Sequence, residues 1–153
     1  MNNDKKELAV AALQHGTVID HIPSAVVFEV VKILGLENTN HAVTIGSNLA
    51  SSKLGSKGIV KVADVVFDDA TLNRIALVAP TAVVNIISDY EVVEKHQVTL
   101  PDVITGIVRC ANPKCITNNE PMQTKFDVVS HRPVLIRCRY CNHSVEGDKA
   151  KIL

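Results

Sequence analysis

The apolar patterns predict an α+β fold in two parts, a layered unit of helices on an antiparallel sheet followed by a smaller β-rich unit. Alternating apolar residues mark strands in both parts, and helical patterns are identified at two places before residue 100. All four cysteines follow residue 100. The first part reads β-α-β-β-α-β, the order of a ferredoxin-like sandwich, and one further strand is expected after it.

The first strand and helix are expected within residues 7–35. Residues 7–22, ELAVAALQHGTVIDHI, are rich in β-forming residues and are interrupted by Gly16, which suggests a bend or bulge. Residues 23–35 begin with Pro23, which suits a first helical turn, and end with Gly35, which suits a C-cap. The apolar residues at helical spacing are Val26, Val27, Val30, Val31 and Leu34. Spacing and end signals outweigh the β-branched content and predict a helix.

The remaining elements of the first part follow in the same way. Residues 41–49 and 57–67 alternate as strands, joined by a turn rich in serine and glycine. Residues 68–80 open with aspartates suited to capping and stop before Pro80, which predicts a second helix. Residues 82–98 are rich in strand formers, with a turn expected at SDY, 88–90.

A domain boundary is expected near residue 100. Polar residues and Pro101 interrupt the apolar pattern in KHQVTLPDVITG, 95–106. Residues 1–100 and 101–153 therefore form separate predicted domains. Short strands are expected in the second domain within VITGIVRC, KFDVVSHRPVLIRC and HSVEG. A unit of about 50 residues has little core and commonly needs a metal or another staple.

Composition and the distribution of apolar residues indicate the cellular compartment in which the protein is expected. Apolar residues make up 46% of the 153 residues, so a packed core is available. The N-terminal MNNDKKELAV lacks the apolar run of a secretory signal, and no apolar stretch reaches the roughly 18 residues of a membrane span. We therefore expect a cytoplasmic protein without a membrane partner. Stable disulfides are not expected in that reducing compartment.

The cysteines have the spacing C-x4-C-x22-C-x2-C, formed by Cys110, Cys115, Cys138 and Cys141. Zinc prefers tetrahedral thiolate ligands, and two pairs on short loops can each supply half of a tetrahedron. Four thiolates leave no open position for water or substrate, so the predicted zinc is structural. The second domain is accordingly expected to be zinc-ribbon-like.

Other roles for the cysteines explain the pattern less well. Buried free cysteines account poorly for two close pairs, and a redox C-x-x-C leaves the first pair unexplained. His143 could replace one thiol, but four thiols make that replacement unnecessary. A catalytic thiol is the least expected role.

Several polar residues of the first domain suggest a site for an anionic ligand. Asp20 and His21 stand together at the end of an apolar strand, although such a pair usually belongs to a solvated turn. The candidate cations are Lys57, Lys61 and Lys95, accompanied by Asn85 and Tyr90. Gathered on one sheet surface, lysine and histidine could hold phosphates. Neither common phosphate-binding glycine motif is present, nor is a convincing nucleophile–base pair, so no catalytic function is expected.

The sequence resembles the regulatory chain of aspartate carbamoyltransferase. The resemblance is carried by GTVIDHIP at 16–23, TIGSNL at 44–49, YEVVEK at 90–95 and the cysteine spacing, and it covers nearly the whole chain. It implies a non-catalytic subunit for the first committed step of pyrimidine biosynthesis. CTP, with UTP, would inhibit and ATP would activate. Regulatory homodimers would join catalytic trimers into an assembly of six catalytic and six regulatory chains.

The resemblance also implies roles for the two domains. Residues 1–100 would be the nucleotide-binding allosteric domain, and residues 101–153 the zinc domain that contacts the catalytic chain. The implied nucleotide pocket comprises Leu13, Asp20, His21, Lys57, Lys61, Asn85, Ile87, Tyr90, Val92 and Lys95. His21, Lys57 and Lys95 are expected near phosphates, and Asp20 and Lys61 near the ribose and base.

Two competing classes remain open on the residues alone. A zinc-ribbon protein that binds nucleic acid gains support from Arg132, Arg137 and Arg139, but zero net charge and few aromatic residues count against it. We therefore expect no nucleic-acid partner. A metal hydrolase would need an open coordination position, which four thiolates do not leave.

Overall fold

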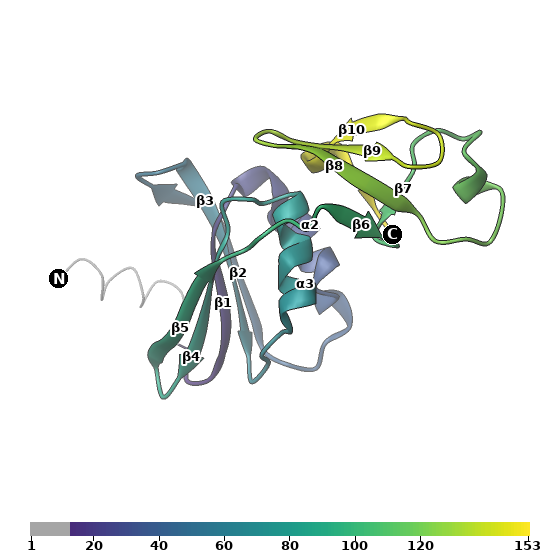
Figure 1. The fold of residues 1–153 in the computed structure, drawn as a ribbon. Coiled ribbons are helices and arrows are strands. Elements are labelled where there is room, and N and C mark those ends of the chain that lie inside the picture. Colours follow the sequence, from purple (N-terminus) through teal and green to yellow (C-terminus); the bar gives the residue numbers. More distant parts are fainter. Residues whose placement is uncertain (1–12) are drawn as a thin grey trace.

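The structure is a computed structural model that describes residues 13–153 (Figure 1). Its first unit is a five-stranded sheet, antiparallel throughout, with strand order β2-β3-β1-β4-β5. The strands are β1 (Gly16–Ile22), β2 (Val43–Ser51), β3 (Gly55–Ala63), β4 (Val83–Ser88) and β5 (Glu91–Gln97). The strand predicted over 7–22 begins at Gly16 among the described residues, and its residues 7–12 lie outside them.

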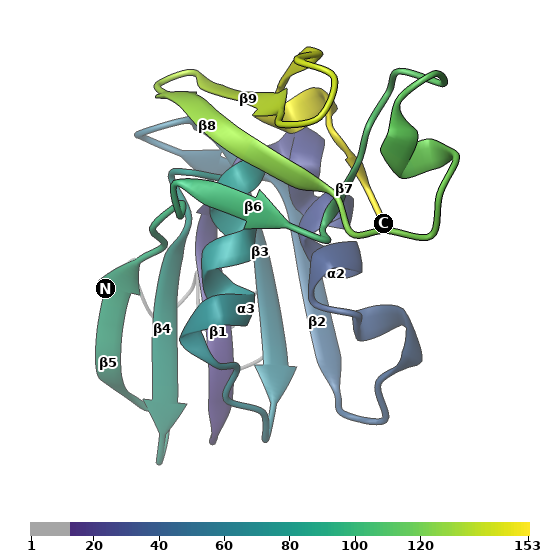
Figure 2. The same cartoon turned by 45° about the vertical axis from the view of Figure 1, so that its right-hand side comes forward.

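Two helices cover one face of this sheet (Figure 2). Helix α2 (Val27–Ile33) connects β1 to β2, and helix α3 (Asp69–Arg74) connects β3 to β4. Strands β1 and β3 pair at the centre, with β2 and β4 outside them. This arrangement confirms the predicted ferredoxin-like sandwich. Strand β5, at the edge beside β4, is the expected further strand.

Both helices are shorter than predicted because each includes a 3-10 turn. The segment predicted over 23–35 is a 3-10 turn at Ser24–Val26 followed by α2, and Gly35 ends it in the left-handed conformation with φ of 67°. The segment predicted over 68–80 is α3 followed by a 3-10 turn at Ile75–Leu77. Asp68 is the predicted cap, since its Oδ1 atom accepts a hydrogen bond from the backbone N–H of Thr71 at 2.8 Å.

The strand boundaries differ modestly from the predictions. The strands predicted over 41–49 and 57–67 form a hairpin of β2 and β3. Strand β3 ends at Ala63 rather than 67, and Asp64 follows it with φ of 60°, which is incompatible with an extended strand. The predicted turn within 82–98 is confirmed, because Asp89 and Tyr90 both have positive φ between β4 and β5.

The core lies between the sheet and the helices. Ile19, Val60 and Val84 stand opposite one another on the three central strands and are fully buried. Helix α2 approaches β3 so closely that a Cβ atom at Gly58 would lie 1.9 Å from Cγ2 of Val27. The absence of a side chain at residue 58 therefore permits this contact.

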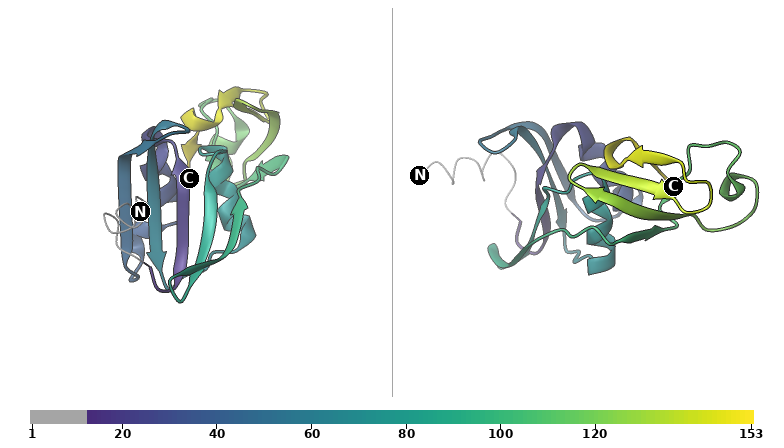
Figure 3. Two further views of the ribbon diagram at one scale, coloured as in Figure 1. Left: turned by 90° about the vertical axis from the view of Figure 1, so that its left-hand side faces the viewer. Right: turned by 45° about the horizontal axis from the view of Figure 1, so that its top comes forward.

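The C-terminal unit contains the short strands predicted from its sequence. Its four-stranded sheet has the order β10-β9-β8-β6, and β7 pairs separately with β11. The strands are β6 (Val103–Thr105), β7 (Val108–Arg109), β8 (Lys125–His131), β9 (Val134–Cys138), β10 (Ser144–Glu146) and β11 (Lys151–Ile152). Figure 3 shows this unit beside one end of the first sheet.

The two units share a continuous apolar core. Leu77 of the first unit and Ile104 and Phe126 of the second belong to one buried cluster. At the contact, a Cβ atom on Gly147 would lie 2.2 Å from the Leu77 carbonyl oxygen. The change from one sheet to the other falls between residues 97 and 103. The division into functional domains near residue 100 stays a prediction. No helix among the described residues is long and apolar enough to cross a membrane.

Candidate functional site

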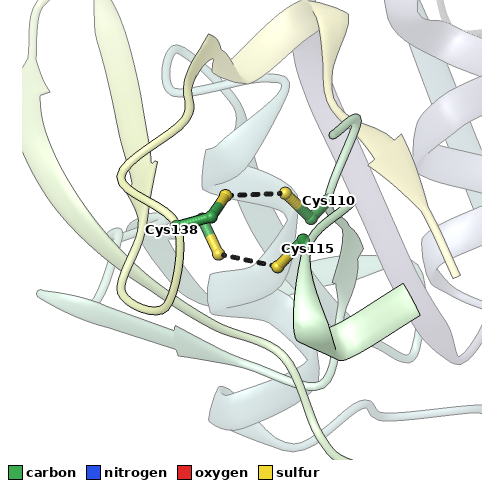
Figure 4. A group of neighbouring side chains, drawn as sticks. Cys110, Cys115 and Cys138 are labelled. Carbon is green, nitrogen blue, oxygen red and sulfur yellow. Dashed lines mark hydrogen bonds between the residues drawn. The ribbon is translucent and has the colours of Figure 1, made fainter. Parts of the chain in front are cut away.

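The four cysteines converge on one point in the C-terminal unit. Their Sγ atoms all lie within 4.8 Å of one another. The Cys110–Cys141 sulfurs are 3.5 Å apart, and the Cys115–Cys138 sulfurs are 3.7 Å apart. Figure 4 shows Cys110 and Cys115, from the loop after β7, directed toward Cys138 at the end of β9. Each of these two short distances joins a cysteine of the first loop to a cysteine of the second.

Short turns position these thiols. Cys110 directly follows β7, and Cys115 closes the first loop with a backbone hydrogen bond to the Asn112 carbonyl at 3.0 Å. Cys138 ends β9, and the backbone N–H of Asn142 donates to its carbonyl at 2.9 Å. Asn142 has φ of 63°, which lets the chain turn sharply after Cys141.

The thiols differ in acidity. Burial raises the pKa of Cys110 to about 12 and also raises the pKa of Cys138. Burial acts in the same direction on Cys141, but hydrogen bonds from the His143 backbone, the Asn112 side chain and the neighbouring thiols lower its pKa to about 7. Cys141 therefore reaches the thiolate form more readily than Cys110 or Cys138.

The cluster fits a metal held by four sulfurs. A tetrahedral zinc site with Zn–S bonds of about 2.3 Å separates its sulfurs by about 3.8 Å. The two cross-loop distances, 3.5 and 3.7 Å, are close to that value. Among the described residues, the candidate metal ligands are the four cysteines, and His143 is not one of them. A bound metal would join both loops into one rigid unit.

The second site is a cavity of about 320 Å³ in the first unit. One row of paired residues crosses four neighbouring strands beside this cavity. It consists of Lys61 on β3, Val18 on β1, Asn85 on β4 and Lys95 on β5. This row is next to the buried row of Ile19, and successive strand residues point to opposite faces. The cavity therefore lies on the sheet face opposite α2 and α3, seen in the left view of Figure 3.

A β-bulge brings β5 into the cavity. Ile87 pairs with Val92 and Ile86 pairs with Glu94, so Val93 is an extra residue in β5. Without such a residue, positions 92 and 95 of a strand would point to opposite faces. With it, both Val92 and Lys95 line the cavity.

The structure brings eight of the ten predicted pocket residues to this cavity. They are Leu13, Asp20, Lys61, Asn85, Ile87, Tyr90, Val92 and Lys95. Val18 and Ile59 also line it and were missed by the sequence analysis. Both are apolar strand residues that look like core in the sequence, and only the strand register shows that they face the cavity.

Lys57 and His21, the two predicted pocket residues that do not line the cavity, lie next to Asp20. The Nζ atom of Lys57 is 2.8 Å from Oδ1 of Asp20, and the backbone N–H of His21 donates to the same oxygen at 2.7 Å. Burial raises the pKa of the Asp20 carboxyl, but these two hydrogen bonds bring it below its ordinary value. Asp20 is therefore held as a carboxylate at the cavity edge.

His21 has two unusual features. Its φ is 57°, and it lies where the pairing of β1 with β3 shifts register. Its buried Nδ1 atom has no hydrogen-bond partner within residues 13–153. A buried imidazole nitrogen without a partner is costly unless a ligand supplies one.

Comparison with known proteins agrees with both parts of the fold. Residues 8–99 match the family model for the allosteric domain of the aspartate carbamoyltransferase regulatory chain, and residues 102–151 match the model for its metal-binding domain. The regulatory chain from Bacteroides thetaiotaomicron is 54% identical to this chain over 153 residues, which is 100% of each chain. The regulatory chain from Parabacteroides distasonis is 54% identical over 144 residues, which is 94% of each chain. The regulatory chain from Pyrococcus abyssi is 50% identical over 145 residues, 94% of this chain and 95% of its own.

Fold and sites together define a two-part regulatory subunit, with an allosteric sheet unit and a metal-binding unit. The chain belongs to the family of aspartate carbamoyltransferase regulatory chains. The family resemblance seen in the sequence is thereby confirmed. The prediction of a regulatory rather than a catalytic chain is confirmed as well, because the relatives are named regulatory chains.

Proposed function

We propose that this chain binds nucleoside triphosphates in the sheet cavity and passes the effect to the catalytic chain of aspartate carbamoyltransferase through a zinc-stabilised docking unit. CTP, together with UTP, inhibits, and ATP activates, in the first committed step of pyrimidine biosynthesis. The observation that carries the nucleotide site is the cross-strand row of Lys61, Asn85 and Lys95 over one cavity.

The cavity chemistry suits such a ligand. Lys95 offers a cation for phosphate oxygens, Lys61 offers a charged donor for the ribose and base, and Asn85 offers an amide for a base edge. The Asp20 carboxylate can accept hydrogen bonds from ribose hydroxyl groups. His21 and Lys57 lie beside Asp20 and are proposed to reach the phosphates. Leu13, Ile87, Tyr90 and Val92 provide apolar surface for the base.

We assign the metal as structural zinc, with Cys110, Cys115, Cys138 and Cys141 as ligands. The cross-loop sulfur distances support this assignment. Once bound, zinc supplies a rigid cross-link between the loops. The four cysteines hold it, and the surrounding loops form the surface for the catalytic chain. Residues 1–100 are then the allosteric domain and residues 101–153 the zinc domain.

The assembly we propose contains six catalytic and six regulatory chains in the cytoplasm, with regulatory homodimers joining catalytic trimers. The continuous apolar core through Leu77, Ile104 and Phe126 gives a physical route for coupling, because a shift of the sheet unit must displace packed side chains of the zinc unit. Binding of nucleic acid is not part of this function. Arg139 is paired with Asp127 at 2.6 Å, which reduces its availability for phosphates.

Two measurements on the purified chain test these proposals. Size-exclusion chromatography with the cognate catalytic trimer should give a large complex in the presence of zinc and separate peaks after complete chelation. A stable complex without metal would contradict the docking proposal. Calorimetry with CTP and ATP should show saturable binding of each, and an absence of heat over a range of temperatures would contradict the nucleotide proposal.

A further inference from the structure

Two asparagines outside the cysteine pattern lie against the first cysteine loop. A 3-10 turn at Ile116–Asn118 follows Cys115. In this turn the backbone N–H of Asn118 donates to the Cys115 carbonyl at 2.9 Å. The backbone N–H of Asn119 donates to the Ile116 carbonyl at 3.0 Å. This turn places the side-chain amides of Asn118 and Asn119 against residues 110–115, the loop that precedes them in the chain.

Asn118 spans the first half of the loop. Its Nδ2 atom donates to the Cys110 carbonyl at 2.9 Å and to the Asn112 carbonyl at 2.8 Å. One amide group thus ties the first cysteine to the middle of the loop. The Asn112 carbonyl also accepts the Cys115 backbone N–H at 3.0 Å, so both of its lone pairs are used.

Asn119 spans the second half in the same manner. Its Nδ2 atom donates to the Pro113 carbonyl at 3.1 Å and to the Cys115 carbonyl at 2.8 Å. Carbonyl oxygens only accept, so each side chain must present its NH2 group to the loop. The two amides together hold four carbonyls of residues 110–115.

The second cysteine loop is closed differently. The backbone N–H of Asn142 donates to the Cys138 carbonyl at 2.9 Å, and the Cys138 N–H donates to the His143 carbonyl at 2.8 Å. These are backbone bonds across a two-residue spacing. The first spacing has four residues and more conformations to lose on ordering, so external bracing has more effect there.

We propose that Asn118 and Asn119 are positioning residues that hold residues 110–115 in the shape required for metal binding and slow the loss of the metal. The proposal rests on the proposed zinc site. Groups that orient metal ligands commonly change metal affinity by about tenfold to a hundredfold. Neither asparagine is assigned as a ligand, because four sulfurs complete a tetrahedral zinc shell and the Nδ2 atoms of both side chains donate to loop carbonyls.

The test measures transfer of zinc from the purified full-length chain to a chromogenic chelator. Asn118→Ala should accelerate release by about tenfold or more, and Asn118→Asp should accelerate it further because a carboxylate would face two carbonyl oxygens. Asn119→Ala should give a smaller increase, since Asn119 is exposed. The matched control is Asn40→Ala, an exposed asparagine of the first unit, which should release zinc at the wild-type rate.

A second readout separates positioning from general destabilisation. In the cobalt-substituted chain, Asn118→Ala should alter the visible absorption bands that report tetrahedral sulfur coordination, while Asn40→Ala leaves them unchanged. If wild-type chain holds zinc and the Asn118 and Asn119 variants release it as slowly as Asn40→Ala, the positioning role is wrong and the zinc site stands. If the wild-type chain binds no zinc, both proposals fail. Should Asn118 variants not fold, Asn119→Ala decides the question by the same comparison.

Discussion

Asp20 on β1 and Lys57 on β3 form an ion pair at the edge of the sheet cavity, with Oδ1 2.8 Å from Nζ. Their side chains are only 22% and 21% exposed, so the pair is screened by water less than a surface pair. The pair also holds Asp20 ionised beside the cavity. The same ion pair thus connects two strands of the sheet and keeps a negative charge at the proposed nucleotide site.

Replacement of Asp20 by asparagine should lower the free energy of unfolding by about 1 kcal/mol at pH 7, since a hydrogen-bonded charge pair is lost. The pKa of Asp20 is lower in the folded chain, so its contribution is present above the ordinary aspartate pKa and is lost as pH falls through the folded value. The difference between wild type and Asp20→Asn should therefore be constant from pH 7 to about 5 and shrink below about pH 4.

Denaturant unfolding of both proteins across this pH range measures that difference. Any release of metal in acid should affect both proteins equally, so it cancels in the difference. Exposed Glu37, on the 3-10 turn Leu36–Asn38, serves as the control through Glu37→Gln, which should change the unfolding free energy little. A difference for Asp20→Asn that grows as the pH falls would show that the sign is wrong.

Removal of a cavity lysine should weaken nucleotide binding. Lys61→Ala and Lys95→Ala are each expected to lower CTP affinity about tenfold, because Lys95→Ala removes a charge-assisted bond to phosphate and Lys61→Ala removes one to the ribose or base. Lys53→Ala removes the same charge from the exposed β2–β3 turn and should have little effect. Calorimetric titration measures all three. Equal losses in the three variants would indicate diffuse charge attraction rather than a defined pocket.

Replacement of one ligand should abolish stable metal retention. Cys138→Ser is expected to purify with little zinc, to lose the ordered C-terminal strands and to fail to join catalytic trimers, because zinc binding contributes directly to folding of such a unit. Elemental analysis and size-exclusion chromatography measure these effects. Ser144→Ala, on exposed β10, is the control and should keep both zinc and assembly. Full assembly of Cys138→Ser without zinc would refute this prediction.

Two glycines should respond differently to an added methyl group. Gly58→Ala places Cβ 1.9 Å from Cγ2 of Val27, so α2 must move away from the sheet, at a cost of about 1–3 kcal/mol. Gly35→Ala meets no atom within 4 Å, and only its left-handed backbone with φ of 67° opposes it, at a cost of about 1 kcal/mol. Thermal unfolding compares the two. A more stable Gly58→Ala variant would rule out the close approach of α2.

The features that the sequence predicted well depend on local patterns. The cysteine pairs lie on short loops, so their spacing alone indicated that four sulfurs could meet. The cap at Asp68 and the chain reversal at Asp89 and Tyr90 also follow from a few neighbouring residues. The succession of strands and helices was sufficient for the ferredoxin-like arrangement, because few topologies accommodate it.

The features that the sequence did not predict depend on register and on distant contacts. Val92 and Lys95 share the cavity only because Val93 is an extra residue in β5, and no local signal marks that bulge. Val18 and Ile59 have the appearance of core residues until strand pairing places them on the cavity side of the sheet, opposite α2 and α3. The shortening of the first predicted helix begins at Val26, whose φ of −118° departs from the helical path.

The most direct test of the account is the aspartate saturation curve of the complex between this chain and its catalytic trimer, measured without nucleotide, with CTP and with ATP. The account predicts that CTP shifts the curve to higher aspartate concentration, that ATP shifts it to lower concentration, and that Lys61→Ala and Lys95→Ala reduce both shifts. Superimposable curves under the three conditions, from a complex shown to be fully assembled, would contradict the claim that the sheet cavity regulates the catalytic chain.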